Sequence, residues 1–195
     1  MQEYSEGTVK DYLKELSEKK IVPGGGSAAA LSAGLGAGLN LMVLNYSIKE
    51  GSSDLLPAKQ KQQEMLDRIS SFIDEDCKVF QSLMKALSEK RNAQKEYISA
   101  AAIPLEVCIE SHESIGITDL LSRGSNKNLF TDVLCALHFL EAAFFSAKLN
   151  VEINLREIKD DPFVSETREK LAVMEEDVER KSAEIEARVR EVLKQ

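Results

Sequence analysis

Along most of the chain, apolar residues recur three and four positions apart, which is the spacing of one face of an α-helix. The first such row runs from Val9 to Leu16, and it follows a Thr8 that can cap a helix together with Asp11. Short segments rich in Pro, Gly, Ser and Asn separate the rows and favour turns. The pattern predicts six helices, over about residues 8–20, 28–50, 57–87, 94–123, 132–158 and 162–192.

The second of these helices falls in a stretch from Ile21 to Ile48 that contains no charged residue. Such a run is long enough to cross a membrane, and Gly34 and Gly38 form the GxxxG pattern with which membrane helices pair. The polar residues inside the run, and the Pro–Gly–Gly–Gly at its start, favour instead a helix buried at the centre of a soluble bundle. There, small residues such as Ala30, Gly34 and Gly38 allow two helices to approach closely. We therefore expect a buried central helix and no membrane contact, with a membrane span as the alternative.

The composition favours one all-α domain, an antiparallel helical bundle that spans residues 1–195. Gly and Pro number only 10 and 4 and Trp is absent, whereas sheet-rich folds use more turn and aromatic residues. No internal repeat or linker divides the chain. The net charge of −8 leaves no surplus of cations to neutralise phosphates, so the sequence disfavours nucleic-acid binding.

The Cys and His residues indicate neither a disulfide framework nor a metal site. Cys77, Cys108 and Cys135 lie far apart in apolar runs, so we expect buried free thiols in a cytoplasmic protein. His112 and His138 have no companion ligand at the spacing of a metal site. We expect no bound metal.

The inward row of the third helix contains one charged residue, Asp76. The row consists of Met65, Ile69, Phe72, Asp76, Phe80, Leu83 and Leu87. A carboxylate desolvated at such a position must be paired, hydrogen-bonded or protonated, and burial raises its pKa. Asp76 is therefore either a buried cap or salt-bridge partner for another helix, or an acid or base in a pocket between helices. The neighbouring Asp74 and Glu75 point elsewhere on the helix and are expected to be solvated.

A run of three glycines, Gly24, Gly25 and Gly26, stands before the uncharged helix, and Ser27 is a plausible N-cap for that helix. Ordering three glycines costs much conformational entropy, so their backbone is expected to approach another group closely. That group is either another backbone segment or a ligand. An anion or a carbonyl-rich ligand would bind the N–H groups of the helix N-terminus.

Three amides and a second carboxylate complete the candidates. Asp132 begins the most apolar helix, where it either caps that helix or faces a cleft together with Asn126. Asn150 and Asn154 are four residues apart on the same helix, and we expect them to hydrogen-bond between helices, with contact to a ligand as the alternative.

Five segments that break the packing pattern occur in a characteristic order: 23–30, 74–80, 103–106, 125–132 and 150–160. Together they resemble the formiminotetrahydrofolate cyclodeaminase and methenyltetrahydrofolate cyclohydrolase family, over essentially the whole chain. The resemblance implies a helical bundle that assembles as a homodimer and binds tetrahydrofolate between helices. It also implies one of two enzyme activities, release of ammonia from formiminotetrahydrofolate or hydrolysis of methenyltetrahydrofolate. A catalytically silent folate-binding or structural bundle is the alternative.

The candidate residues take roles in that chemistry. Both reactions need a base for the nucleophile and an acid for the leaving nitrogen, which carboxylates supply without a metal or cofactor. Asp76 is then the acid or base, and Asp132 holds the cationic one-carbon unit or shares the proton transfer. Asn126 and the glycine loop with Ser27 position the folate. Asn150 and Asn154 join them as substrate-binding residues.

Overall fold

The computed structural model describes residues 3–48, 54–124 and 126–194, which contain helices and no strand. The helices are α1 (Val9–Leu16), α2 (Gly25–Ser47), α3 (Leu56–Ser88), α4 (Gln94–Gly124), the 3₁₀ turn η1 (Lys127–Leu129), α5 (Phe130–Leu155) and α6 (Asp161–Leu193). The predicted helices are confirmed, with boundaries that differ by a few residues. The turn expected at residues 51–54 and Ser125 lie largely outside the described residues.

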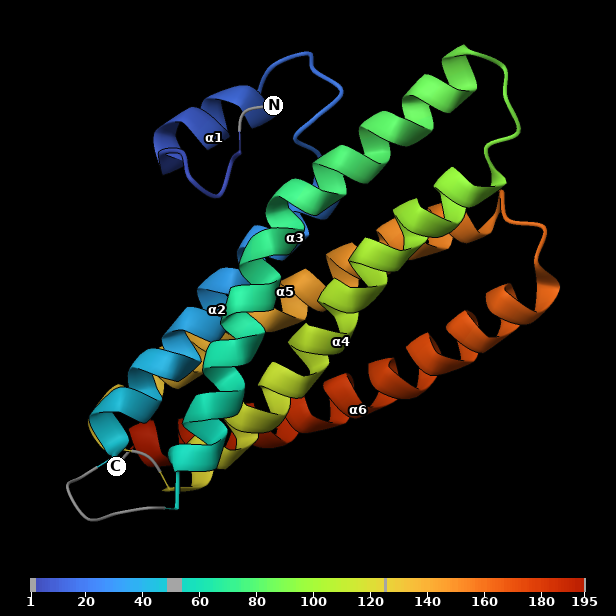
Figure 1. The fold of residues 1–195 in the computed structure, drawn as a ribbon. Helices are drawn as coiled ribbons and strands as arrows, with labels where there is room; N and C mark the ends of the chain where they lie inside the picture. The colour runs from blue at the N-terminus through green and yellow to red at the C-terminus, as the bar shows by residue number, and fades with distance from the viewer. Residues whose placement is uncertain (1–2, 49–53, 125, 195) are drawn as a thin grey trace.

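The five long helices α2 to α6 lie side by side in a bundle, and α1 lies outside it (Figure 1). Helix α2 packs against α5, α3 and α4, while α6 covers α4 and α5. The pair α2 and α5 is antiparallel, since Gly25 lies beside Asn150 at one end and the Asn126 N–H bonds Ser47 at the other. The prediction of an all-α bundle is therefore confirmed.

The close approach of α2 to α5 occurs at Gly36 and not at the GxxxG pair. A Cβ added to Gly36 would lie 2.6 Å from Leu140 Cγ and 3.0 Å from the Ala136 carbonyl oxygen. A Cβ at Gly38 would meet no atom within 4 Å, and one at Gly34 would make an ordinary contact with Ile69. The expectation of tight packing at Gly34 and Gly38 was wrong, because the helix turns another of its faces to α5.

The fully buried polar residues of the uncharged helix α2, Ser27 and Asn40, are hydrogen-bonded within the protein. Asn40 is fully buried, and its amide donates to the Ser114 carbonyl and the Thr118 hydroxyl at 3.0 and 2.9 Å. By length and composition, two helical segments in the described residues could cross a membrane, 25–47 and 127–155, with 56% and 39% of their most apolar windows buried. The larger buried share of the first is consistent with the expected central helix.

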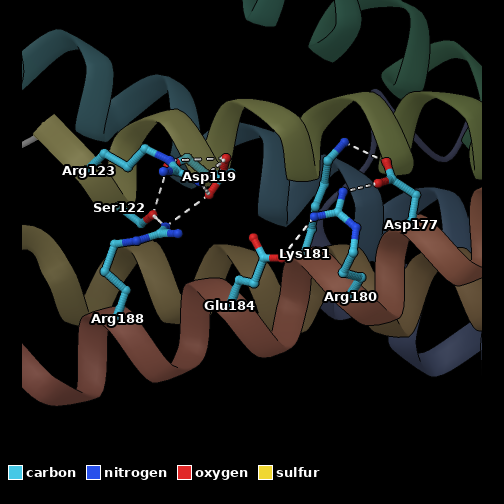
Figure 2. Close-up of polar contacts among 8 residues, drawn as sticks. All are labelled: Asp119, Ser122, Arg123, Asp177, Arg180, Lys181, Glu184 and Arg188. Atoms are coloured by element: carbon cyan, nitrogen blue, oxygen red, sulfur yellow. Dashed lines mark hydrogen bonds and ion pairs between the residues drawn. The ribbon is translucent and has the colours of Figure 1, made fainter.

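Helix α6 is held by an apolar row and by ion pairs on its borders. Leu171, Met174, Val178, Ile185 and Val189 of this helix are buried. Figure 2 shows Arg188 of α6 reaching Asp119 and Ser122 of α4, and Asp177 contacting Arg180 and Lys181. These contacts are half-exposed, so the buried row supplies most of the stabilisation.

The thiols differ from the expectation in one case. Cys77 and Cys108 are buried, but Cys135 is exposed. Cys135 lies on the side of α5 that faces away from the bundle, where an apolar sequence run does not imply burial.

Candidate functional site

A cavity of about 360 Å³ opens between the N-terminal end of α2, the second half of α3, the start of α4 and the C-terminal end of α5. This volume is in the usual range for small-molecule sites. Its polar end is lined by Gly24, Gly25, Gly26, Asp76, Asn150 and Asn154, and its other walls by Ile21, Val22, Val79, Phe80, Leu83, Met84, Leu87, Tyr97, Ala100, Ile153 and Glu157. Six of the nine residues singled out in the sequence thus line one cavity.

Asp76 caps helix α2 from the neighbouring helix. The residue at the N-cap position is Gly24, which has no side chain to offer, and Asp76 of α3 accepts a hydrogen bond from the Ser27 N–H. Ser27 is therefore not the N-cap that the sequence suggested. It lies fully buried in the first turn, and its hydroxyl is 3.2 Å from that of Tyr12.

The Asp76 carboxyl is both a cap and a group that titrates near neutrality. Burial is the main cause that raises its pKa to about 6, and the Ser27 N–H opposes the shift. Asp76 can therefore be both a helix cap and an acid or base in a pocket, because the carboxyl that caps α2 also lines the cavity. At pH 7 the group is mostly ionised yet accepts a proton readily, as a general base requires.

Gly26 is required for the approach of Asp76. A Cβ built on Gly26 would lie 2.0 Å from Asp76 Oδ1 and 2.5 Å from its Cγ. Real Cβ atoms essentially never come that close, so only glycine admits the carboxyl at this place. The predicted close approach of the glycine run is therefore to a side chain, a third option beyond backbone and ligand.

The side chains of Asn150 and Asn154 on α5 are fixed by hydrogen bonds that their NH₂ groups donate to backbone carbonyls. Asn150 donates to the Ser146 carbonyl at 2.8 Å, and Asn154 donates to the carbonyls of Asn150 and Ala100 at 2.8 and 3.1 Å. Asn154 therefore makes the expected bond between helices, whereas Asn150 bonds within its own helix. Because the nitrogens are used as donors, the amide oxygens of these two cavity-lining residues are available as acceptors.

The remaining cavity lining is mostly apolar, apart from Tyr97 and Glu157, and includes residues that sequence reasoning missed or placed in the core. Phe80 and Leu87 were expected in the core, but they are 37% and 41% exposed and line the cavity. Tyr97 and Glu157 were not identified. Glu157 follows Asn150 and Asn154 at helical spacing, which could have indicated it, while Tyr97 left no signal.

Asn126 and Asp132 lie near the N-terminal end of α5, whereas the cavity is at its C-terminal end. Eighteen residues of α5 separate Asp132 from Asn150, which is about 27 Å at 1.5 Å per residue. Neither residue lines the cavity. The Asn126 side chain caps the turn η1 by accepting from the Asn128 N–H, and α5 has no side-chain cap, so the capping interpretation of Asp132 was wrong.

Asp74 is buried and not solvated as expected. It is 7% exposed, and its carboxylate accepts from the Tyr4 N–H at 2.5 Å and from the Ser5 hydroxyl at 2.6 Å. The residues that cover it come from the N-terminus, some 70 positions away, which no local pattern on α3 indicates.

The cavity thus combines a carboxyl whose pKa is raised to about 6, a helix N-terminus and two side-chain amides beside a mostly apolar wall. A carboxylate and amide oxygens suit a cationic amidine or iminium, and the first N–H groups of α2 suit a carbonyl oxygen. Within the described residues, no three His, Cys, Asp or Glu side chains gather as metal ligands would.

Comparisons with known proteins agree on one family. The profile described as formiminotransferase-cyclodeaminase matches residues 8–173. A methenyltetrahydrofolate cyclohydrolase from Methylorubrum extorquens is 29% identical, over 82% of this chain and 84% of that protein. The formimidoyltransferase-cyclodeaminase of Gallus gallus is 26% identical over 88% of this chain but only 35% of its own length. The chain therefore spans about a third of that longer relative.

A solved structure shares the whole fold. The crystal structure of formiminotetrahydrofolate cyclodeaminase from Thermotoga maritima superposes with a TM-score of 0.89, at 26% identity, over 96% of this chain and 98% of that one. The likeness includes α6, most of which lies beyond the segment that the family profile matches.

Proposed function

This chain belongs to the formiminotransferase-cyclodeaminase family, and on that premise we propose that it is an enzyme of folate one-carbon metabolism. It acts on the one-carbon unit between the N5 and N10 nitrogens of tetrahydrofolate. The observation that carries the proposal is Asp76, a carboxyl titrating near neutrality at the polar end of a cavity with an apolar wall.

Two reactions of this unit fit the site, and each has a stand-alone relative of similar length. In the cyclodeaminase reaction, N10 attacks the formimino carbon and the tetrahedral intermediate expels ammonia. In the cyclohydrolase reaction, water attacks the methenyl carbon and the ring opens to 10-formyltetrahydrofolate. Asp76 takes the proton of the attacking N10 or water and returns it to the leaving nitrogen. The oxygens of Asn150 and Asn154 face the cationic one-carbon unit.

The deciding experiment assays both substrates on one preparation. Loss of the 5,10-methenyltetrahydrofolate absorbance band identifies the cyclohydrolase. Appearance of that band from formiminotetrahydrofolate, with one ammonia per turnover, identifies the cyclodeaminase. Tight binding of folate with no change of absorbance on either substrate would instead identify a silent folate-binding protein.

We further propose that the protein is a cytoplasmic homodimer joined through the outer face of α2 and α5. On this face lie Ala28, Ser32 and Leu35 of α2 and Cys135, Phe139, Ala142, Ser146, Leu149 and Ile153 of α5. None of these side chains is charged, so two copies of a chain with net charge −8 can meet here without repulsion. The face extends over 18 residues of α5, about 27 Å, and is about 20 Å wide, so it covers roughly 540 Å² per partner, or about 1,100 Å² in total, just above the ~1,000 Å² expected of a specific interface.

Such a dimer gives Asp132 a place in the site. Asp132, Phe139, Ser146 and Ile153 are spaced by seven residues and form one row on α5, and Ile153 lines the cavity. If α5 pairs antiparallel with its copy about its midpoint, Asp132 of one copy meets Ile153 of the other. Asp132 then reaches the site from the second copy.

Mixing two inactive variants tests this arrangement. Asp76→Asn and Asp132→Asn are each expected to be inactive, but after dissociation and reassociation together they should recover about a quarter of the unsubstituted activity. Half of the dimers are then mixed, and each mixed dimer keeps one intact site. No recovery, in a mixture that light scattering shows to be dimeric, would place both carboxylates in one chain or exclude Asp132.

A further inference from the structure

Residues 3–22 form a segment, here called the N-terminal strap, that is attached to the bundle by few side chains. Helix α1 within it has a single buried residue, Tyr12, while Val9 and Leu13 are 68% and 55% exposed. In Figure 1 the strap, with α1, lies outside the bundle and leads into the N-terminal end of α2. Its last residues, Ile21 and Val22, line the cavity. The strap is therefore one wall of the site.

One buried carboxylate anchors the start of the strap. Asp74 Oδ1 accepts from the Tyr4 N–H, and Oδ2 accepts from the N–H and the hydroxyl of Ser5 at 3.2 and 2.6 Å. A buried charge is tolerated only when it is hydrogen-bonded, and here all the donors come from the strap. Asp74 is not among the residues that line the cavity, so its effect on the substrate would be indirect.

The anchor is connected to Asp76 through contacts between neighbouring groups. The Tyr4 ring packs edge-on against the Tyr12 ring with 5.7 Å between centroids. The Tyr12 hydroxyl is 3.2 Å from that of Ser27, and the Ser27 N–H donates to Asp76. The docked strap thus holds the first turn of α2, and with it the carboxyl that faces the cavity.

We propose that Asp74 and Tyr12 are positioning residues, which dock the N-terminal strap and thereby hold Ser27 and Asp76 in place for the reaction. The proposal rests on the proposed function for its catalytic consequence. The docking itself is a structural property and can be tested without folate.

Cys77 reports docking independently of activity. It is 2% exposed and lies on α3 one turn after Asp74, next to Tyr4, Tyr12 and Ser27. Burial raises its pKa to about 11, so a thiol reagent attacks it slowly while the strap is docked. Cys108 is buried in the core, and the exposed Cys135 is removed as Cys135→Ser.

The test compares Asp74→Asn with Glu75→Gln in the Cys135→Ser background. Asn presents an NH₂ group where Oδ2 accepts both Ser5 donors, so the strap should detach and Cys77 should react with a disulfide reagent at least ten times faster. KM should rise about 5- to 10-fold with little change in melting temperature. Glu75 is the matched control, because the described residues show no bond from it to the strap, and its variant should match the parent protein.

A second variant distinguishes docking of the strap from positioning of Ser27 and Asp76. Tyr12→Phe keeps the buried ring but removes the contact between the Tyr12 and Ser27 hydroxyls, so kcat should fall about 3- to 10-fold while Cys77 stays protected. Unchanged Cys77 reactivity in Asp74→Asn would overturn the anchor. A detached strap with unchanged KM and kcat would overturn the positioning role. An unsubstituted protein inactive on both folates would contradict the proposed function, and the thiol result would still decide the anchor.

Discussion

Replacing Asp76 with Asn should lower kcat by roughly 10²-fold or more, the usual scale for a lost acid–base group, with little change in KM. Asn keeps the size of the side chain and an oxygen that can accept the Ser27 N–H, so the cap on α2 remains. Only the titrating group is removed. The measurement is steady-state kinetics on both folate substrates.

The pH dependence of kcat/KM should also differ between the unsubstituted enzyme and Asp76→Asn. In the unsubstituted enzyme, kcat/KM should fall as the pH drops through about 6, since a base must be ionised, and this limb should be absent from Asp76→Asn. A pH profile without an inflection near 6 in the unsubstituted enzyme would argue against Asp76 as the base.

The free energy of unfolding should fall as the pH rises, whereas kcat/KM should increase. The Asp76 pKa is raised from 3.8 to about 6 on folding. Well below pH 4 the carboxyl is protonated in both the folded protein and the unfolded chain, so it does not lower the free energy of unfolding. Between pH 4 and 6 the unfolded chain ionises first and stability falls, by at most about 3 kcal/mol once the pH exceeds 6. The melting temperature of Asp76→Asn relative to the parent should therefore rise from pH 4 to 6 and then stay constant.

The opposite pattern would mean that Asp76 is only a structural cap. That role predicts a lower melting temperature at every pH and an unaltered kcat in the molecules that remain folded. Calorimetry and kinetics on the same samples distinguish the two outcomes.

Replacing Gly26 with Ala should lower kcat nearly as much as removing the carboxylate. The new Cβ would lie 2.0 Å from Asp76 Oδ1, so the carboxyl must rotate away from its place. Misplacement of a reacting group by about 1 Å costs on the order of 10²-fold. Stability should change little, because the lost cap on α2 costs about 1 kcal/mol and Ala recovers a similar amount of chain entropy.

A double variant shows whether both substitutions act through one group. If Gly26→Ala acts by displacing Asp76, adding it to Asp76→Asn should lower kcat no further. Gly116→Ala is the control, since a Cβ at this helical glycine of α4 meets no atom within 4 Å, and it should leave kcat unchanged. Multiplicative losses in the double variant would show that Gly26 has a separate role, such as direct contact between its backbone and the folate.

Much of the fold could be predicted because its signals are local. The apolar rows identified the six α-helices of the described residues, though not the short 3₁₀ turn η1, and Pro, Gly and Asn marked most of their ends. The position of Asp76 on the inward row of α3 was also correct, since helical spacing alone determines which residues share a face. The same spacing placed Asn150 and Asn154 together on α5.

The predictions were wrong where helical spacing showed which residues share a face of a helix but not which segment packs against that face. Phe80 was expected in the core and lines a cavity, Cys135 was expected to be buried and is exposed, and Asp74 was expected to be solvated and is covered by the strap. Each depends on residues far away in the chain. Asp132 is a further case, because whether it belongs to a site depends on a second copy.

The sequence by itself determined the helices, their apolar rows and the presence of one carboxylate among them, since these depend on residues within a few turns of each other. Only the tertiary structure decided that Asp76 caps α2 from α3, that Gly26 makes room for it and that Asp74 binds the strap. These contacts join segments 49 to 70 positions apart. Their formation depends on how whole helices pack, and no local spacing encodes which helix meets which.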